Sequence, residues 1–400
     1  MANATLGSDI IESFSGMGRL NLHARGDWMH RHTRRSIWMV AAVATFAAAG
    51  TQLGRAQQAD VKSAEQVYKN ITQLKGTPAD QLIPAMQFMA GALGVNCEFC
   101  HVEGKLDLDD KPAKKRARDM IAMTEAINKD GFKGRQTVTC YSCHGGAERP
   151  VGVPPVVTSD MPPHPETPSG SRRGAVMDEA ASAAIVDQIA AKYLDAAGGG
   201  DVLKKITARV MTGSLTAGGN QTPVEIYAKA NDKVVVISHA QNGTSYTVSD
   251  GTSGWTGNTG RPARDMSSQE AWATSVQYDV ALPLRLKQLF PQLRPGGPEQ
   301  VNGVDCVVLN GTAPGKPSAR LWFDPKTGLL ARMLFLADSP VGRVPTQVDF
   351  SDYRDVDGVK MPFRRTTSGM TRRSTIQLTD IKSNSPIDDA KFAKPADAIK

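Results

Sequence analysis

The chain has 400 residues and a formal net charge of +7 at pH 7, and 22% of its residues are charged. This length exceeds what one ordinary hydrophobic core accommodates, so we expect two domains with further segments outside them. The basic residues form no long cluster typical of nucleic-acid binding, and four of the five cysteines lie in two short motifs, which excludes a disulfide scaffold.

Residues 1–56 are predicted to be an N-terminal extension and a signal peptide. The basic stretch RHTRR at 31–35 precedes an apolar run over 37–49, and GRA at 54–56 offers a small-residue cleavage site. The apolar run is shorter than the roughly 20 residues that a transmembrane helix needs. We therefore expect a periplasmic protein whose mature chain starts near Gln57.

Residues 57–150 are the first predicted domain, which we expect to be mainly helical. One helix is expected to begin at Pro84 and end at Gly94, and a second to begin at Pro112 and end at Gly131. Both carry residues at i, i+3 and i+7, a spacing that places side chains on one helix face. These residues are Met86, Met89 and Leu93 in the first helix, and Met120, Met123 and Ile127 in the second. The shared pattern indicates an internal repeat.

Each repeat ends in the sequence CxxCH. The two motifs are Cys97, Cys100 and His101, and Cys140, Cys143 and His144. Four thiolates suit a structural zinc ion, and each pair could instead be a redox dithiol. Covalent haem c also explains both histidines, because the cysteines add to the haem vinyl groups while the histidine coordinates iron. We therefore predict two covalently bound haem c groups, with His101 and His144 as iron ligands.

The repeated methionines are the predicted sixth ligands of the two irons. The repeat favours Met86 and Met120, with Met89 and Met123 as the alternatives. A thioether ligand favours Fe(II) and raises the reduction potential, and a filled sixth position leaves no place for a substrate. We therefore expect an electron carrier that has no catalytic residues and is not an enzyme.

A proline-rich stretch over 151–177 is predicted to be an extended linker, because this composition cannot pack into a core. The second predicted domain, residues 178–400, opens with a helix over 178–196 that glycines at 198–200 end. After it, strands are expected in VEIYAKA, KVVVISHA, SYTVSD, VDCVVLNG, ARLWFD, LLARMLFLA, TQVDFSDYR and STIQLTDI. Cys306 is expected to be a buried strand residue.

One helix near 280–289 is expected to interrupt these strands, and turns are expected at 324–328 and 355–358. The predicted fold of this domain is an antiparallel sheet that curves around something or packs on a helix. The whole chain is therefore predicted to be multidomain, with a mainly helical part followed by a β-rich part.

The motif-bearing part resembles the c-type cytochrome subunit of photosynthetic reaction centres. The resemblance spans about residues 60–155 and includes LGVNCEFCH, KKRARDMIAMTEAIN and VTCYSCHGG. It implies a string of helix-turn-CxxCH units in which Met86 pairs with His101 and Met120 with His144. The family typically has four motifs and this chain has two. Respiratory or other periplasmic electron transfer therefore fits as well as service to a reaction centre.

The second domain resembles the periplasmic lipoprotein-sorting and carrier proteins, through RLWFDPKTGLLARM, VDFSDYRDVDGVKMPF and DDAKF. That resemblance implies a curved half-barrel with an apolar cavity that accepts lipid. The leading expectation is an exported dihaem cytochrome that passes single electrons between redox partner proteins, membrane-bound ones among them. The alternative is a periplasmic lipid- or lipoprotein-binding protein with an accessory cytochrome domain and an acyl lipid in its second domain.

Overall fold

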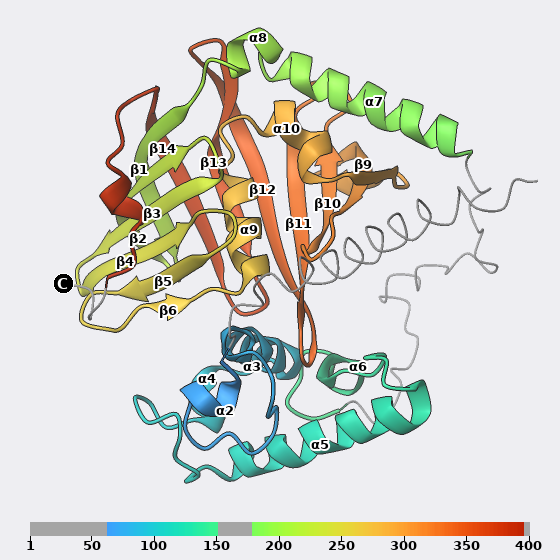
Figure 1. The fold of residues 1–400 in the computed structure, drawn as a ribbon, viewed down its shortest axis with the longest axis vertical. Coiled ribbons are helices and arrows are strands. Elements are labelled where there is room, and N and C mark those ends of the chain that lie inside the picture. Colours follow the sequence, from blue (N-terminus) through green and yellow to red (C-terminus); the bar gives the residue numbers. More distant parts are fainter. Residues whose placement is uncertain (1–61, 151–177, 396–400) are drawn as a thin grey trace, which may run out of the picture. The chain divides into compact units, whose positions relative to one another are not determined.

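The computed structural model describes residues 62–150 and 178–395 (Figure 1). The predicted signal peptide and the predicted linker lie outside these described residues. Among the described helices, none is both long enough and apolar enough to span a bilayer.

The first described stretch is helical, as predicted. Its helices are α2 (Ala64–Val67), α3 (Ala79–Leu93), α4 (Cys97–Cys100), α5 (Pro112–Phe132) and α6 (Cys140–His144). They enclose a small core of five buried apolar side chains, Ala64, Leu74, Leu82, Ala85 and Ile121. Most of the remaining side chains of this stretch are half-buried or exposed.

The first long helix starts earlier than predicted and ends where predicted. The expected start at Pro84 is wrong, because α3 begins at Ala79, directly after Pro78, and Pro84 lies buried inside the helix. A proline marks a helix start only when its missing N–H belongs to the unbonded first turn, and here the helix continues through it. Gly94 ends α3 in the left-handed conformation with φ of 67°. A Cβ at Gly94 would lie 2.1 Å from the carbonyl oxygen of Gly146, so this close approach also requires glycine.

The second long helix begins at Pro112, as predicted, but its predicted end at Gly131 is wrong. Helix α5 runs through Gly131 to Phe132, and Lys133 adopts the left-handed conformation with φ of 55°. Its amide donates to the carbonyl of Asn128, and the next amide, of Gly134, donates to the same oxygen. These bonds provide donors for a carbonyl in the last turn of the helix, and they hold Lys133 in the left-handed conformation although it is not a glycine.

The second described stretch contains an antiparallel sheet of 14 strands, which confirms the predicted antiparallel β domain. The strand order is β6-β5-β4-β3-β2-β1-β14-β13-β12-β11-β10-β9-β7, and β8 pairs with β9. The strands are β1 (Ala208–Ala217), β2 (Asn220–Lys229), β3 (Lys233–Ala240), β4 (Gly243–Ser249), β5 (Gly254–Asn258), β6 (Arg264–Asp265), β7 (Gln292–Pro295), β8 (Glu299–Val301), β9 (Val304–Thr312), β10 (Ser318–Phe323), β11 (Leu330–Ser339), β12 (Gly342–Val356), β13 (Val359–Ser368) and β14 (Arg373–Ser383). Neighbours in the sheet are mostly neighbours in sequence, joined as hairpins.

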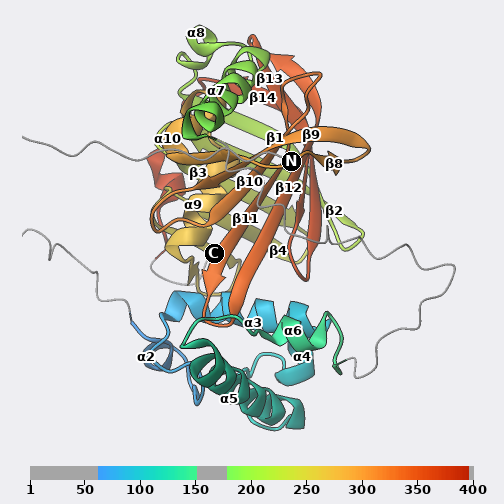
Figure 2. The same ribbon diagram turned by 90° about the vertical axis from the view of Figure 1, so that its right-hand side faces the viewer.

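Helices cover one face of this curved sheet. They are α7 (Glu179–Ala196), α8 (Gly200–Leu203), α9 (Ser268–Gln277) and α10 (Leu282–Leu289), and a 3-10 turn, η2 (Asp389–Phe392), follows the last strand. Figures 1 and 2 show α9 and α10 lying along the inner face of the sheet. The predictions of a helix over 178–196 and of a second helix near 280–289 are confirmed by α7 and α10.

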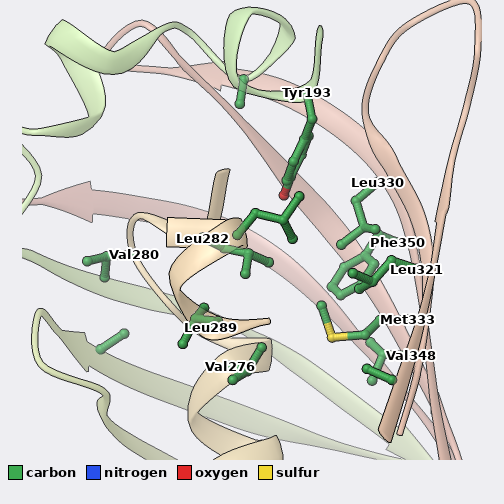
Figure 3. Close-up of a cluster of buried hydrophobic side chains, with 14 of the residues drawn as sticks. Tyr193, Val276, Val280, Leu282, Leu289, Leu321, Leu330, Met333, Val348 and Phe350 are labelled. Atoms are coloured by element: carbon green, nitrogen blue, oxygen red, sulfur yellow. The ribbon is translucent and has the colours of Figure 1, made fainter. Parts of the chain in front are cut away.

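The core of the sheet lies between this face and the helices. In Figure 3, Leu289 of α10 and Val276 of α9 lie over the face of the sheet that carries Met333 and Val348. Met333 and Val348 have no exposed surface, and neither does Cys306 of β9, so the prediction of a buried strand cysteine is confirmed. This core is continuous from α7 to β14.

Candidate haem-binding site

Each CxxCH motif opens a single helical turn. The cysteines of the first motif begin and end α4, with Asn96 before it, and those of the second lie in α6, with Thr139 before it. Residues three apart in a helical turn project from the same face, so both thiols of each pair point to one side. The four sulfurs form no disulfide, Cys97 and Cys143 are exposed, and Cys100 and Cys140 are half-buried. Each pair is therefore open to a bulky group that approaches from that side.

Both motif histidines are held in the same way. Nδ1 of His101 lies 2.8 Å from the carbonyl oxygen of Leu106, and Nδ1 of His144 lies 3.0 Å from that of Ala147. A carbonyl oxygen only accepts hydrogen bonds, so Nδ1 carries the proton and Nε2 keeps its lone pair. A metal-bound histidine is usually fixed by such a bond from its other nitrogen. The same arrangement in both motifs prepares each Nε2 as a ligand.

Neither alternative to haem is favoured by this geometry. No group of three or more His, Cys, Asp or Glu side chains among the described residues is placed to hold a metal ion. Burial raises the pKa of the Cys100 and Cys140 thiols. A redox dithiol needs a thiol whose pKa is lowered, and burial has the opposite effect on these two thiols.

The structure brings the two motifs onto one small framework. Helix α6 contacts both α3 and α5, and α4 contacts α5. The amide of Gly146, just after the second motif, donates to the carbonyl of Ala92 in α3 at 2.9 Å. Each motif therefore packs on the helix of the other repeat, and the second packs on its own as well.

The predicted sixth ligands differ in their surroundings. Met86 and Met89 of α3 are half-buried and pack against the small helical core. Met120 and Met123 of α5 are each 43% exposed, and Ile127 is 38% exposed. Helix α5 turns a different face inward, where it buries Lys114, Ile121 and Asn128. An uncovered apolar face beside a CxxCH turn fits a flat apolar cofactor such as haem.

Two polar side chains of α5, which we did not predict as part of the site, hold the loops beside the motifs. The ammonium group of Lys114 donates to the carbonyls of Leu106 at 3.0 Å and of Leu108 at 2.8 Å. The carbonyl of Leu106 thus accepts from both Lys114 and His101. The sequence around Lys114 is rich in charged residues, a pattern that favours a solvent-exposed helix start. In the structure this lysine is only 8% exposed.

Asn128 holds the loop before the second motif, as Lys114 holds the loop after the first. Its side-chain nitrogen donates to the carbonyl of Val138 at 2.7 Å, and its oxygen accepts from the amides of Thr137 at 3.0 Å and Val138 at 2.8 Å. These three bonds tie the loop that leads into Cys140 to the last two turns of α5. A buried asparagine late in a helix is the signal that could have identified it, because asparagine is unfavourable there unless it has such partners.

An ion-pair network supports the loop after the first motif. Arg118 donates to the carboxylate of Asp109 at 2.9 Å, Asn70 donates to it at 2.9 Å, and Lys114 lies 3.2 Å away. The bond from Arg118 is the largest cause that holds the pKa of Asp109 well below its usual range, and those from Asn70 and Lys114 add to it. Asp109 is therefore charged throughout the neutral range.

Solved structures similar to this chain are known. One is a putative outer membrane lipoprotein-sorting protein domain from Vibrio parahaemolyticus, 11% identical, which covers 53% of this chain and 95% of that chain with a TM-score of 0.36. Another is a LolA superfamily protein from Nitrosomonas europaea, 14% identical, which covers 52% of this chain and 97% of that chain with a TM-score of 0.35.

Sequence comparisons find relatives among cytochromes. A cytochrome c-554 from Chloroflexus aurantiacus is 32% identical over 85 residues, 20% of each protein. A photosynthetic reaction center cytochrome c subunit from Thermochromatium tepidum is 31% identical over 117 residues, 28% of each protein. The chain thus spans less than a third of the length of these curated relatives. The family model described as photosynthetic reaction centre cytochrome c subunit matches residues 20–243, more than half of the chain. This chain belongs to the photosynthetic reaction centre cytochrome c subunit family.

Proposed function

We propose that this protein is an exported dihaem c-type cytochrome that carries single electrons between redox partner proteins. The observation that supports this most is the duplicated histidine arrangement, in which the Nδ1 of His101 and of His144 each donates to a backbone carbonyl. Membership of the cytochrome family implies covalently bound haem c, and two CxxCH motifs supply two attachment sites.

In this proposal each side chain of the site has one role. A bound haem c supplies an iron that alternates between Fe(II) and Fe(III). The thiols of Cys97 and Cys100, and those of Cys140 and Cys143, tether the two groups. The carbonyls of Leu106 and Ala147 fix the orientation of the histidine rings through Nδ1, so that each Nε2 would be available to hold an iron. Precise orientation reduces the rearrangement that would accompany a change of oxidation state.

The methionines complete the ligand sets in this proposal, Met86 for the first motif and Met120 for the second. A thioether is a soft ligand that stabilises Fe(II). A haem held by both a histidine and a methionine would have no open position for a substrate, which would favour electron transfer over catalysis. We therefore propose a carrier and not an enzyme, with partners that exchange electrons at the haem edges.

The proposed location is the periplasm. Covalent haem attachment takes place outside the cytoplasm, and the family to which the chain belongs is consistent with an extracytoplasmic protein. Exposed basic residues of α5, Lys115 and Arg116, offer contacts for an acidic partner surface or for haem propionates.

Counting haems tests the proposal. The full chain, expressed with a haem-attachment system, should carry two covalent haems, measured as the mass increase of the intact protein and as the haem-to-protein absorbance ratio. The double variant Cys140→Ser/Cys143→Ser should carry one haem, and so should Cys97→Ser/Cys100→Ser. A colourless protein that binds stoichiometric zinc through the same cysteines would overturn the proposal.

Spectroscopy of the oxidised protein tests the sixth ligands. A His/Met haem shows a weak sulfur-to-iron charge-transfer band in the far red, and we expect Met86→Ala and Met120→Ala each to remove about half of it. The matched controls Met89→Ala and Met123→Ala should leave the band intact. If instead the controls remove the band and the first pair do not, the ligands lie one helical turn away.

A lipid- or lipoprotein-binding protein is the alternative proposal. The observation behind this alternative is a cavity of about 60 Å³ on the helix-covered face of the sheet, which offers space for a small ligand in the second domain. An acyl chain needs a much longer space, so α10 would have to move aside. Native mass spectrometry of the purified full chain should then show bound acyl lipid, and a chain without lipid would contradict this alternative.

A further inference from the structure

The cavity in the sheet domain lies where the end of α7 and the start of α10 meet strands β1, β12 and β13. Its volume is about 60 Å³. Figure 3 shows the region from the side, with Tyr193 pointing toward Leu282 and with Leu330 and Phe350 on the facing strands. These apolar and aromatic side chains share the cavity wall with two arginines, Arg209 and Arg365.

Arg209 is buried and only partly bonded. It is 3% exposed, and its Nη1 donates to the carbonyl of Val280 at 2.8 Å. Its Nε and Nη2 are also buried and have no acceptor among the described residues. These two nitrogens form one edge of the planar guanidinium. In arginine–carboxylate pairs such an edge donates two parallel hydrogen bonds to the two carboxylate oxygens.

The carboxylate in the cavity wall, Asp279, is already bonded to other groups. Asp279 has a side chain that is 2% exposed, and it accepts from Arg285 at 2.6 Å and from the amide of Ala281 at 2.8 Å. Arg285 also pairs with Asp232 at 2.6 Å. Asp279 therefore acts on Arg209 through space without filling its open edge.

Arg365 adds a second buried positive charge. It is 6% exposed, its side chain donates to the carbonyl of Gln277, and its guanidinium carbon lies 3.8 Å from the ring centroid of Tyr278. Within the described residues, neither Arg365 nor Arg209 forms a salt bridge. The cavity wall thus carries three cationic side chains, Arg209, Lys360 and Arg365, against one carboxylate, Asp279, and this excess of positive charge favours an anion. Burial lowers the pKa of Arg209 to about 10, so it still carries its charge at neutral pH.

We propose that this cavity binds a small carboxylate, whose two oxygens accept hydrogen bonds from Nε and Nη2 of Arg209 and whose short apolar part contacts Leu282 and Phe350. A water molecule needs about 10–15 Å³ of such a volume, so the cavity admits roughly four to six non-hydrogen atoms. That size corresponds to acetate, propionate or butyrate. The largely apolar wall disfavours inorganic phosphate, because a dianion would lose its hydration there. This site does not depend on the proposed haem function.

Calorimetric titration of the full haem-loaded chain at pH 7 and constant ionic strength tests the site. We expect propionate to bind with one molecule per chain and at least tenfold more tightly than propionamide, which has the same shape without the charge. Affinity should fall beyond butyrate as the cavity becomes too short. Equal binding of propionate and propionamide, or no binding of either, would overturn the proposal. Stronger binding of phosphate, or affinity that keeps rising to octanoate, would also overturn it, the latter in favour of an acyl-lipid site.

Substitution of Arg209 tests the contact itself. Arg209→Lys keeps the charge but loses the two-nitrogen edge, and Arg209→Met loses both, so each should weaken propionate binding at least tenfold. Arg332→Lys, an arginine paired with Asp349 on the sheet, is the matched control and should bind as the unchanged protein does. We expect Arg209→Met to melt no lower than the unchanged protein without ligand, because it removes a buried cation that lacks a carboxylate partner. If it fails to fold, the propionate-to-propionamide comparison on the unchanged protein decides. Unchanged affinity in both folded variants would refute the role of Arg209.

Discussion

The two described stretches differ in how much of their structure their own side chains can stabilise. The helical stretch, residues 62–150, has a core cluster of five buried apolar residues, whereas the largest cluster of the sheet domain has 33. On α5, Met120 and Met123 are exposed, whereas α10 of the sheet domain buries Leu282, Leu286 and Leu289. The comparison indicates that the sheet folds on its own apolar core and that the helices depend on the proposed haems for much of theirs.

Loss of haem attachment should give the largest effect, because it should destabilise the helical stretch and leave the sheet unchanged. In the variant Cys97→Ala/Cys100→Ala/Cys140→Ala/Cys143→Ala, we expect the amides of α3 and α5 to lose most of their protection, because a core of five residues is too small to hold them. The strands should keep theirs. Hydrogen exchange with mass spectrometry measures both, and full protection of α5 without haem would show that the comparison is wrong.

Removal of a large side chain from the sheet core should have the next largest effect on stability, and it should affect only the sheet. Phe335 of β11 is 1% exposed and packs edge-on against Trp272 at a centroid distance of 5.9 Å. Phe335→Ala should lower the free energy of unfolding by about 3–5 kcal/mol. Urea unfolding followed by tryptophan fluorescence measures this, while the haem spectrum should not change. Leu284→Ala, at a position 38% exposed, is the control and should stay within about 0.5 kcal/mol.

A smaller effect is expected from the loop before the second motif. Asn128→Ala removes three hydrogen bonds and leaves the amide of Val138 and its carbonyl without their partner. We expect a loss of about 1–3 kcal/mol in the helical stretch. Unfolding followed at the haem Soret band measures it, with Glu125→Ala, an exposed position on the same helix, as the control. If both variants unfold alike, Asn128 does not hold the loop.

The smallest expected effect concerns pH. The pKa of Asp109 is lowered in the folded protein, so its charge stabilises the fold above the unfolded pKa of about 3.9, and this stabilisation disappears as the pH falls below that value. Asp109→Asn should therefore be less stable than the unchanged protein at pH 7, and the difference should shrink below pH 4. Arg118→Gln should reproduce most of this change, because Arg118 is the main partner. A difference that stays constant down to pH 3 would exclude this explanation.

Eight of the 14 strands were predicted from sequence, whereas β1, β5, β6, β7, β8 and β13 were not. All eight predicted strands are present, because β-branched and alternating patterns mark them clearly. Strand β1 was missed because Gly213 interrupts its pattern. The register with β14 shifts at this glycine, where a Cβ would lie 2.2 Å from the carbonyl of Gln377. Strand β13 was missed because Pro362 and two arginines hide its alternation.

Helix α9 was missed although its start carries a readable signal. Ser267 and Glu270 form a capping box, with bonds of 3.1 Å and 2.9 Å between side chains and amides. No element was predicted over residues 268–277, so this polar helix start was overlooked.

The site was only partly predictable for a different reason. CxxCH names the thiols and histidines by residue type, but the groups that orient the histidines are the backbone carbonyls of Leu106 and Ala147, which any residue could supply. Spacing also placed Met120 and Ile127 on an apolar face, and sequence alone does not show that this face is left uncovered by protein. The choice of Met86 and Met120 as ligands stays a prediction.

The burial of Cys306 has a consequence for how this chain matures. The proposed attachment of two haems would use thiols in pairs, and a fifth reactive thiol would then offer oxidants a way to cross-link the wrong sulfurs. Cys306 has no exposed surface, and burial raises the pKa of its thiol, so it stays protonated and a poor nucleophile once β9 has paired. The folded sheet thereby shields the odd sulfur from oxidants and leaves the four motif thiols, two for each proposed haem.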